Sequence, residues 1–450
     1  MADIITTRDI ARHKHKPQPA SDAITTNSPR TAKPEQRVIY KMVHGLLGKN
    51  AWADAPRVWI IGGGPSLRDF DWSLLAGEVV LGCNRCYERP NVGATICIDG
   101  ANSAGFLNWA EMGKFGDSWR NYTGLKIYSQ LEQKHDGVPE DVYVVDRMRT
   151  QGRDLILEKG LPQTNNTGTL AVQFAAALGA KDIRLLGFDM GSPGEKQEHH
   201  HDGYPREQKA DVCNGMIPEF NRLAPDLSLM GVHVTLYGPS KLKCFDKKPL
   251  ADAVAELQKK PTRPLVVCAV TPSYIREAEE MMRTARAMGF ETIVDAYEDR
   301  GDWYLNTHYK PVFIKRMLET HKRPILWLDA DARIRKYPKA FDNLKADIGW
   351  VWWDWEKCGG IAKELELSTG MLYLRPKADV YRLLDAWQQA NEENPKEHDQ
   401  TNLQRLLDDG FRRGRLKAKQ LPMSYSQIFD LQRSLGEPVI EQMQASRRFK

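Results

Sequence analysis

The chain has 450 residues, of which 41% are hydrophobic and 27% charged, a balance typical of a globular protein rather than of a disordered or fibrous one. Its net charge of +5 is modest for this length and does not by itself indicate a nucleic-acid binder. No run of ~18 apolar residues occurs, the N-terminus lacks a secretory apolar stretch and the seven cysteines are scattered, so we expect a cytoplasmic chain without a membrane span.

The first part of the chain divides into a tail and an α/β pattern. Residues 1–36 are polar and carry prolines among Ser, Thr and Lys, which predicts a disordered tail. Over residues 37–245, short apolar runs alternate with helical patterns, as in a largely parallel sheet with helices on its faces, so we expect a Rossmann-like domain. The expected strands are 58–61, 79–83, 95–98, 142–145, 183–186 and 232–237.

A glycine turn follows the first of these strands and reads Gly62-Gly63-Gly64-Pro65-Ser66. Missing Cβ atoms let the backbone approach a ligand, and the amides of such a turn can face a phosphate. Glycine turns are also common here for packing reasons, and neither the dinucleotide spacing nor a P-loop lysine is present. This motif alone leaves a phosphate site and a packing turn equally open.

Three later segments add a resemblance to this pattern: CNRCYE at 83–88, the stretch 164–190 and the stretch 231–242. Together they resemble bacterial sialyltransferases of the lipooligosaccharide type and related Rossmann-like proteins, over roughly residues 56–245. The resemblance implies that the glycine turn and the Asn after the second strand hold a cytidine nucleotide sugar. The residues so assigned are Gly62, Gly64, Ser66 and Asn84.

The same resemblance implies a catalytic histidine in an interval that here contains His199, His200 and His201. Imidazole titrates near neutral pH, so a histidine there could take the proton of an acceptor hydroxyl as it attacks the anomeric carbon. A solvated loop, or one that takes up a stray metal ion, explains the run equally well. The sequence does not distinguish among the three side chains.

A second α/β pattern follows a short connection. Residues 246–263 are rich in Lys and Pro around one amphipathic piece, which predicts a linker. Over residues 264–450 we expect strands at 265–270, 325–328 and 371–374, with a helix at 275–288. The predicted fold class is therefore α/β, with two tandem domains.

The strand at 325–328 ends in Asp329-Ala330-Asp331. Side chains alternate across a strand, so residues two apart share a face and both carboxylates can meet one cation. Mg²⁺ and Mn²⁺ prefer oxygen ligands and also bind diphosphate, so the pair predicts a metal site for a nucleoside diphosphate. Without further context, two solvated aspartates at a strand end are the simpler explanation.

The context of this pair resembles the GT-A fold of metal-dependent glycosyltransferases over roughly residues 264–450. The motifs that carry the resemblance are AVTP at 269–272, a lysine-bearing helix, the D-x-D strand, STGM at 368–371 and EHDQ at 397–400. The resemblance implies that Thr271 binds the nucleotide and Lys310 a phosphate. It also implies that Asp329 and Asp331 bind Mn²⁺ or Mg²⁺.

Two features near this site leave alternatives open. Asp399 opens a helix, so it either caps the positive end of the helix dipole or contacts a donor or acceptor sugar. Many relatives carry a further metal-binding histidine near the C-terminus, where this chain reads Glu441-Gln442-Met443-Gln444. That departure weakens the expectation of a complete metal site.

Four tryptophans cluster in the segment GWVWWDWE, at positions 350, 352, 353 and 355. Alternation along a strand would send two rings to each face. We therefore expect one pair in the core, and only the other pair can stack on a sugar or a base.

The sequence predicts a metal-dependent glycosyltransferase that uses nucleotide sugars, with either one active domain or two. The acceptor is a glycan or, because tandem chains of this kind are similar to bacteriophage proteins, a hydroxymethylated base in phage DNA. A basic run at 412–419 would then contact the DNA backbone. The alternative is a structural or assembly protein with degenerate nucleotide-binding domains.

Overall fold

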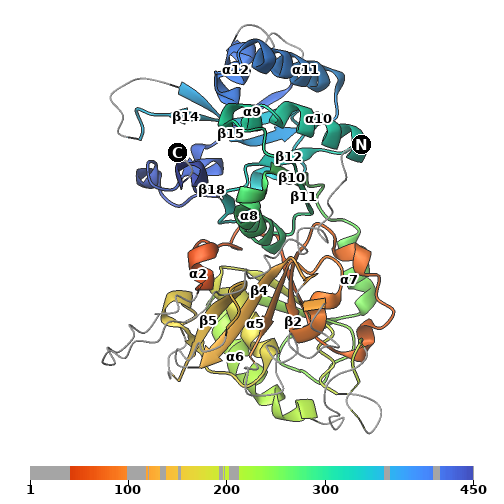
Figure 1. Cartoon of the computed structure of the whole chain (residues 1–450). Helices are drawn as coiled ribbons and strands as arrows, with labels where there is room; N and C mark the ends of the chain where they lie inside the picture. The colour runs from red at the N-terminus through yellow and green to blue at the C-terminus, as the bar shows by residue number, and fades with distance from the viewer. Residues whose placement is uncertain are drawn as a thin grey trace, which may run out of the picture.

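The computed structural model describes residues 41–98, 118–119, 121–131, 138–149, 154–191, 196, 198–201, 212–358, 365–408 and 416–448. The expected tail at 1–36 lies outside these ranges, as do the arginines of the basic run at 412, 413 and 415. Within the described residues, no helix is both long and apolar enough to cross a membrane. The chain is an α/β protein with two large sheets, which confirms the predicted class (Figure 1).

The first sheet has nine strands in the order β6-β5-β4-β3-β2-β1-β7-β8-β9, and every neighbouring pair is parallel. Sequence order reverses between β1 and β7, and ligands of open parallel sheets bind in the crevice at such a reversal. The strands are β1 Val58–Ile61, β2 Val79–Cys83, β3 Ala94–Cys97, β4 Leu125–Leu131, β5 Val142–Met148, β6 Leu161–Pro162, β7 Asp182–Leu186, β8 His233–Tyr237 and β9 Asp246–Lys248.

Helices α2 (Val43–Leu46), α5 (Thr167–Ala177), α6 (Ile217–Leu229) and α7 (Leu250–Leu257) accompany this sheet. Helix α5 begins directly after Asn166, whose side chain accepts a hydrogen bond of 2.7 Å from the Thr169 amide. Nearly all of its side chains are buried, as expected of a helix against the centre of a parallel sheet.

The stretch expected as a linker, residues 246–263, contains strand β9 and helix α7. Ala253 and Leu257 of α7 are buried against Trp59 and Tyr237 of the first sheet, so this segment packs as part of the N-terminal unit. A short amphipathic pattern is enough for such packing, since one apolar stripe suffices to bury a two-turn helix on a sheet.

The second sheet has six strands in the order β11-β10-β12-β15-β14-β16 and is mixed, because β15 runs antiparallel to both β12 and β14. A small third sheet, β13-β18-β17, lies beside it. The strands are β10 Leu265–Val270, β11 Thr292–Ala296, β12 Ile325–Leu328, β13 Ala332–Ile334, β14 Ile348–Asp354, β15 Leu365–Leu374, β16 Ala418–Leu421, β17 Gln427–Ile428 and β18 Ile440–Gln442. The helices are α8 Ile275–Ala287, α9 Trp303–Thr307, α10 Lys310–His321, α11 Ala378–Glu393 and α12 Asp399–Leu406.

Trp350, Trp352 and Trp353 of β14, and Trp355 just after its end, divide between two faces as the alternation predicts. Trp350 and Trp352 lie in a buried cluster with Trp327 and Trp387. Trp353 and Trp355 point to the opposite face, where Trp353 is buried and Trp355 is only partly covered. Of the four rings, Trp355 is the least covered and therefore the most open to a ligand.

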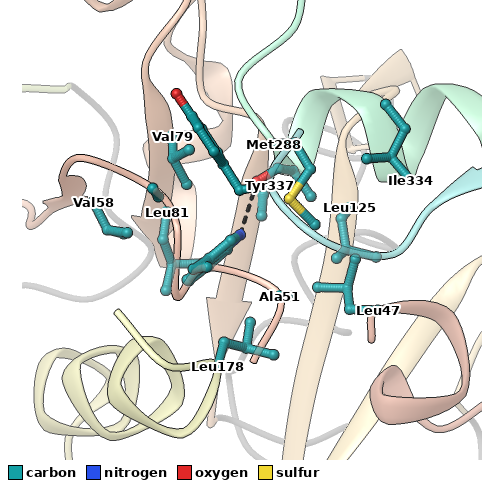
Figure 2. Close-up of a cluster of buried hydrophobic side chains, with 14 of the residues drawn as sticks. Leu47, Ala51, Val58, Val79, Leu81, Leu125, Leu178, Met288, Ile334 and Tyr337 are labelled. Carbon is teal, nitrogen blue, oxygen red and sulfur yellow. Dashed lines mark hydrogen bonds between the residues drawn. The ribbon is translucent and has the colours of Figure 1, made fainter. Parts of the chain in front are cut away.

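Helix α8 joins the two large sheets, and Figure 1 shows it between them. It packs on β2, β3 and β4 of the first sheet and on β13 of the second unit. One apolar cluster continues across this junction, with Leu81 and Leu125 on one side and Met288 and Ile334 on the other (Figure 2). The two units therefore share a hydrophobic core.

Candidate active sites

The larger candidate site is a cavity of about 430 Å³ at the carboxyl ends of β10 and β12. Thr271 follows β10, and Asp329 follows β12. Lys310 at the start of α10 and Asp399 at the start of α12 also line this cavity, as does Asp331. All five residues that the sequence assigned to the second domain therefore meet in one place.

Lys310 is a buried cation at the floor of this cavity, with only 8% of its surface exposed. Its ammonium lies 3.2 Å from Asp329 Oδ1, 3.2 Å from Asp399 Oδ2 and 3.2 Å from Thr369 Oγ1. Burial alone would lower the pKa of Lys310, but the two carboxylates outweigh burial and raise the pKa above its usual value. Lys310 donates hydrogen bonds to Asp329 and Thr369, whereas its contact with Asp399 is an ion pair, so the two carboxylates balance the charge of the ammonium.

The two acids of the D-x-D motif lie in a turn between β12 and β13, where the Ala332 amide donates to the Asp329 carbonyl. Strand alternation is therefore not what brings them together, because the strand ends at Leu328. Asp329 accepts hydrogen bonds from Trp327 Nε1 (3.0 Å) and from Lys310. Its charge is thus already balanced inside the protein.

Asp331 has different partners. Its Oδ2 accepts a 2.6 Å hydrogen bond from the Ala445 amide, and its carbonyl accepts one from the Met443 amide. Across the described ranges, no Lys, Arg or His forms an ion pair with this carboxylate, and Oδ1 keeps its acceptor capacity. Of the two acids, Asp331 is the one that remains open to a cation.

The charge of the lining fits a divalent ion that binds together with a diphosphate. Four carboxylates (Asp329, Asp331, Glu366, Asp399) face two cationic side chains (Lys310, Arg447), which leaves a net charge of −2 before any anionic ligand arrives. Within the described residues, no group of three or more His, Cys, Asp or Glu side chains is arranged to hold a metal by itself. Diphosphate oxygens would therefore have to complete the coordination of an ion at Asp331 and Asp329.

The cavity also includes residues that the sequence did not single out, notably Trp303 and Glu366. Glu366 lies on β15 directly opposite Trp353 of β14. Its place in the cavity follows from strand register, which single-sequence patterns do not reveal.

The smaller candidate site is a cavity of about 240 Å³ in the crevice between β1 and β7. Gly62, Gly64 and Asn84 line it, as does the N-terminal turn of α5. A Cβ at Gly62 would lie 2.5 Å from the Gly187 carbonyl oxygen, and one at Gly64 would lie 2.6 Å from the same atom. Close packing against the end of β7 therefore accounts for both glycines, whatever else they do.

Ser66 is not part of this lining. Its hydroxyl donates to Asp189 Oδ1 (2.7 Å) and its amide to Asp189 Oδ2 (2.8 Å), so both of its polar groups face Asp189. Asn84 has a left-handed backbone (φ 51°), and its Oδ1 accepts a hydrogen bond of 3.0 Å from the Thr167 hydroxyl. Of these two residues, only Asn84 is placed to meet a ligand.

The three histidines do not share one position. His199 and His201 line the smaller cavity, whereas His200 does not, and its ring lies beside Trp72 and Arg89. Burial lowers the pKa of all three, and the nearby arginines lower it further, to about 4 for His200 and about 2 for His201. A base with so low a pKa holds a proton poorly at neutral pH, which makes His201 a weak candidate for general base.

A family model of known proteins matches the part of the chain that contains most of the larger site. Residues 297–445 match the family model of nucleotide-diphospho-sugar transferases, a range that contains Lys310, Asp329, Asp331 and Asp399 but not Thr271. No curated protein matches the chain. The resemblance of residues 56–245 to sialyltransferases lies outside the matched range and stays a prediction.

Among solved structures, the chain is similar to a glycosyltransferase involved in the glycosylation of the major capsid of PBCV-1. The two are 13% identical, with a TM-score of 0.32, and the match covers 40% of this chain and 94% of the other. On the family-model match, the C-terminal part of the chain is a nucleotide-diphospho-sugar transferase domain, and the protein is a glycosyltransferase.

Proposed function

We propose that the larger cavity binds a nucleotide sugar together with Mn²⁺ or Mg²⁺ and transfers the sugar to an acceptor hydroxyl. The observation that carries this proposal is the meeting of Asp331, Asp329 and Lys310 in one cavity within the range of the family match. That match favours an enzyme over a structural or assembly protein with degenerate nucleotide sites. It also agrees with a GT-A-like domain over residues 264–450.

In this proposal Asp331 is the principal protein ligand of the ion, and Asp329 is the second. When bound, the ion neutralises the diphosphate as it leaves the sugar. Asp331 also fixes the segment around Met443 and Ala445 through backbone hydrogen bonds, so the C-terminal part of the chain is held against the diphosphate position.

Lys310 and Asp399 have positioning roles in this proposal. The Lys310 ammonium, whose charge is balanced by Asp329 and Asp399, holds Asp329 in place. Asp399 is 3% exposed and pairs with the same ammonium. We therefore assign its carboxylate to the ion pair with Lys310 and not to a contact with a sugar.

The nucleoside would lie beyond Thr271, near two aromatic rings of the lining. Thr271 is hydrogen-bonded to the Ser273 hydroxyl at 3.0 Å, and Tyr274 and Tyr297 line the same end of the cavity. Aromatic faces stack on nucleobases, so these rings suit the base.

Calorimetry with nucleoside diphosphates and nucleotide sugars, each with and without Mn²⁺, tests this function. We expect at least one nucleotide to bind and Mn²⁺ to tighten its binding by about 10-fold or more, because the ion offsets a net negative lining. Absence of nucleotide binding by the wild-type chain would refute the proposal.

A second donor site is supported by the smaller cavity. We propose that residues 37–245 form a Rossmann-like, sialyltransferase-like domain whose crevice between β1 and β7 takes a cytidine nucleotide sugar near Asn84 and the N-terminus of α5. Cytidine monophosphate should bind to an Asp331→Asn variant as well as to the wild type, since the two cavities are separate. An Asn84→Ala variant should lose this binding, and unchanged affinity would count against the site.

A further inference from the structure

One wall of the larger cavity comes from the hairpin of β14 and β15 and is formed by Trp353, Trp355 and Glu366. Trp353 Nε1 donates to the Ser426 carbonyl at 2.6 Å, and Trp355 Nε1 donates to Glu366 Oε2 at 2.7 Å. The two rings lie 5.9 Å apart and are steeply inclined to each other. Because both indole N–H groups already have protein acceptors, the two tryptophans offer a ligand only apolar ring surface.

Glu366 supplies the polar part of the same wall. Its carboxylate accepts hydrogen bonds from Trp355 Nε1 and from Gln400 Nε2. No Lys, Arg or His forms an ion pair with it among the residues that the structure describes, in contrast to Asp329 and Asp399. A carboxylate has about four acceptor positions, so Glu366 can still accept hydrogen bonds from the hydroxyl groups of a ligand.

A chain of hydrogen bonds fixes Glu366 relative to the D-x-D motif. Gln400, which donates to Glu366, accepts a bond of 3.3 Å from the Thr369 amide, and the Thr369 hydroxyl accepts from Lys310 at 3.2 Å. Lys310 in turn holds Asp329. These hydrogen bonds therefore hold the wall in a fixed position relative to the proposed donor site.

We propose that this wall is the acceptor subsite and that the acceptor is a saccharide. A pyranose ring has an apolar C–H face and an edge of hydroxyl groups. The face matches the partly exposed ring of Trp355, and the edge matches the free acceptor positions of Glu366.

The same wall suits DNA poorly. Glu366 is one of the four carboxylates that give the lining its net charge of −2, and duplex phosphates need cationic partners. This inference rests on the proposed function, because it places the acceptor beside the proposed donor site.

The test uses the full-length chain with a nucleotide sugar found by calorimetry and a panel of methyl pyranosides as acceptors. The variants are Trp355→Ala, Trp355→Phe and Glu366→Gln, with Glu397→Gln as the matched control. Glu397 pairs with Arg405 outside the cavity. The readouts are the KM for the acceptor, the KM for the donor and the calorimetric affinity for the nucleoside diphosphate.

We expect Trp355→Ala and Glu366→Gln each to raise the KM for the acceptor substrate by about 10-fold or more. The first variant loses a stacking face, and the second loses a charged hydrogen-bond acceptor. Affinity for the nucleoside diphosphate should stay within about twofold of the wild type for both, because neither residue belongs to the proposed nucleotide end. Trp355→Phe keeps an aromatic face and should recover most of the acceptor affinity, and Glu397→Gln should behave as the wild type.

Three results would overturn the saccharide subsite: an unchanged acceptor KM, a parallel loss of nucleotide affinity, or transfer to hydroxymethylated duplex DNA but to no pyranoside. Wild-type protein that transfers sugar to none of the pyranosides would overturn it as well. Failure of the proposed function itself is distinguishable, because the wild-type chain would then bind no nucleotide at all.

Discussion

Lys310 and Asp399 form a buried ion pair in which Nζ and Oδ2 are 3.2 Å apart and the two side chains are 9% and 4% exposed. The same ammonium also balances Asp329, so one cation serves two carboxylates. Removing one member of such a buried set leaves the remaining charges uncompensated, which costs more than the set itself contributes.

Lys310→Met should therefore lower the free energy of unfolding by about 3–5 kcal/mol, because Asp329 and Asp399 lose their cation. Lys315 on the same helix provides a control, since its pair with Asp385 is partly exposed, with side chains 32% and 53% exposed, and its loss should cost less than about 1 kcal/mol. Urea unfolding at neutral pH measures both. The double variant Lys310→Met/Asp399→Asn should regain part of the loss, and equal losses for Lys310→Met and Lys315→Met would show that the buried pair is unimportant.

The two acids of the D-x-D motif should respond differently to metal. Asp331→Asn keeps an oxygen for the Ala445 amide but removes the charge that has no cationic partner, so the effect of Mn²⁺ on nucleoside diphosphate affinity should almost vanish. Asp329→Asn should keep part of that effect, because its charge is already balanced by Lys310. Calorimetric titrations with and without Mn²⁺ report this directly, and a larger loss of the Mn²⁺ effect in Asp329→Asn would reverse the assignment.

Local patterns in the sequence predict much of this fold. Strands such as β1, β10 and β12 are short apolar runs bounded by turn residues, and the sequence predicts each of them at or close to its observed bounds. The alternation of the β14 tryptophans also follows from sequence, because period two is a property of every strand.

The rest depends on contacts between distant segments. The occupation of the Lys310 ammonium by Asp399 and Thr369 brings together three separate elements, and no local pattern reveals such a meeting. The position of Glu366 requires the register of β14 against β15. His200 differs from its two neighbours only because it turns toward Trp72 and Arg89.

Acid should destabilise the N-terminal unit through His200. This side chain is 6% exposed, and its Nδ1 accepts from Arg89 Nε at 3.2 Å, so the folded chain holds the ring neutral. Burial and the Arg89 charge lower its folded pKa to about 4 from the usual 6.5. Between these values the unfolded chain binds a proton that the folded chain does not, so stability is present above pH 6.5 and is lost as the pH falls toward 4.

The loss from this one group should reach on the order of 3 kcal/mol by pH 4. Urea unfolding over a series of pH values should show a slope that is smaller in His200→Gln than in the wild type. His233 is largely exposed, so His233→Gln should keep the wild-type slope. Parallel pH profiles for the wild type and His200→Gln would exclude His200 as the source.

The shared core between the two units should couple their unfolding. Trp52 is fully buried at the junction, where its Nε1 donates to the Ala287 carbonyl of α8 at 3.1 Å and its ring lies 5.7 Å from Phe174. Trp52→Ala should cost about 3–5 kcal/mol, as large-to-small changes of buried aromatic residues do.

Trp387 is the matched control, because it is equally buried but lies in the cluster on the far face of the second sheet. Trp387→Ala should lower the melting temperature and leave a single calorimetric transition. Trp52→Ala should instead separate the unfolding transition of the unit with the nine-stranded sheet from that of the unit with the six-stranded sheet, since the α8 contact links the two units. If both variants melt in one transition with matching calorimetric and van't Hoff enthalpies, the junction is not what couples the two units.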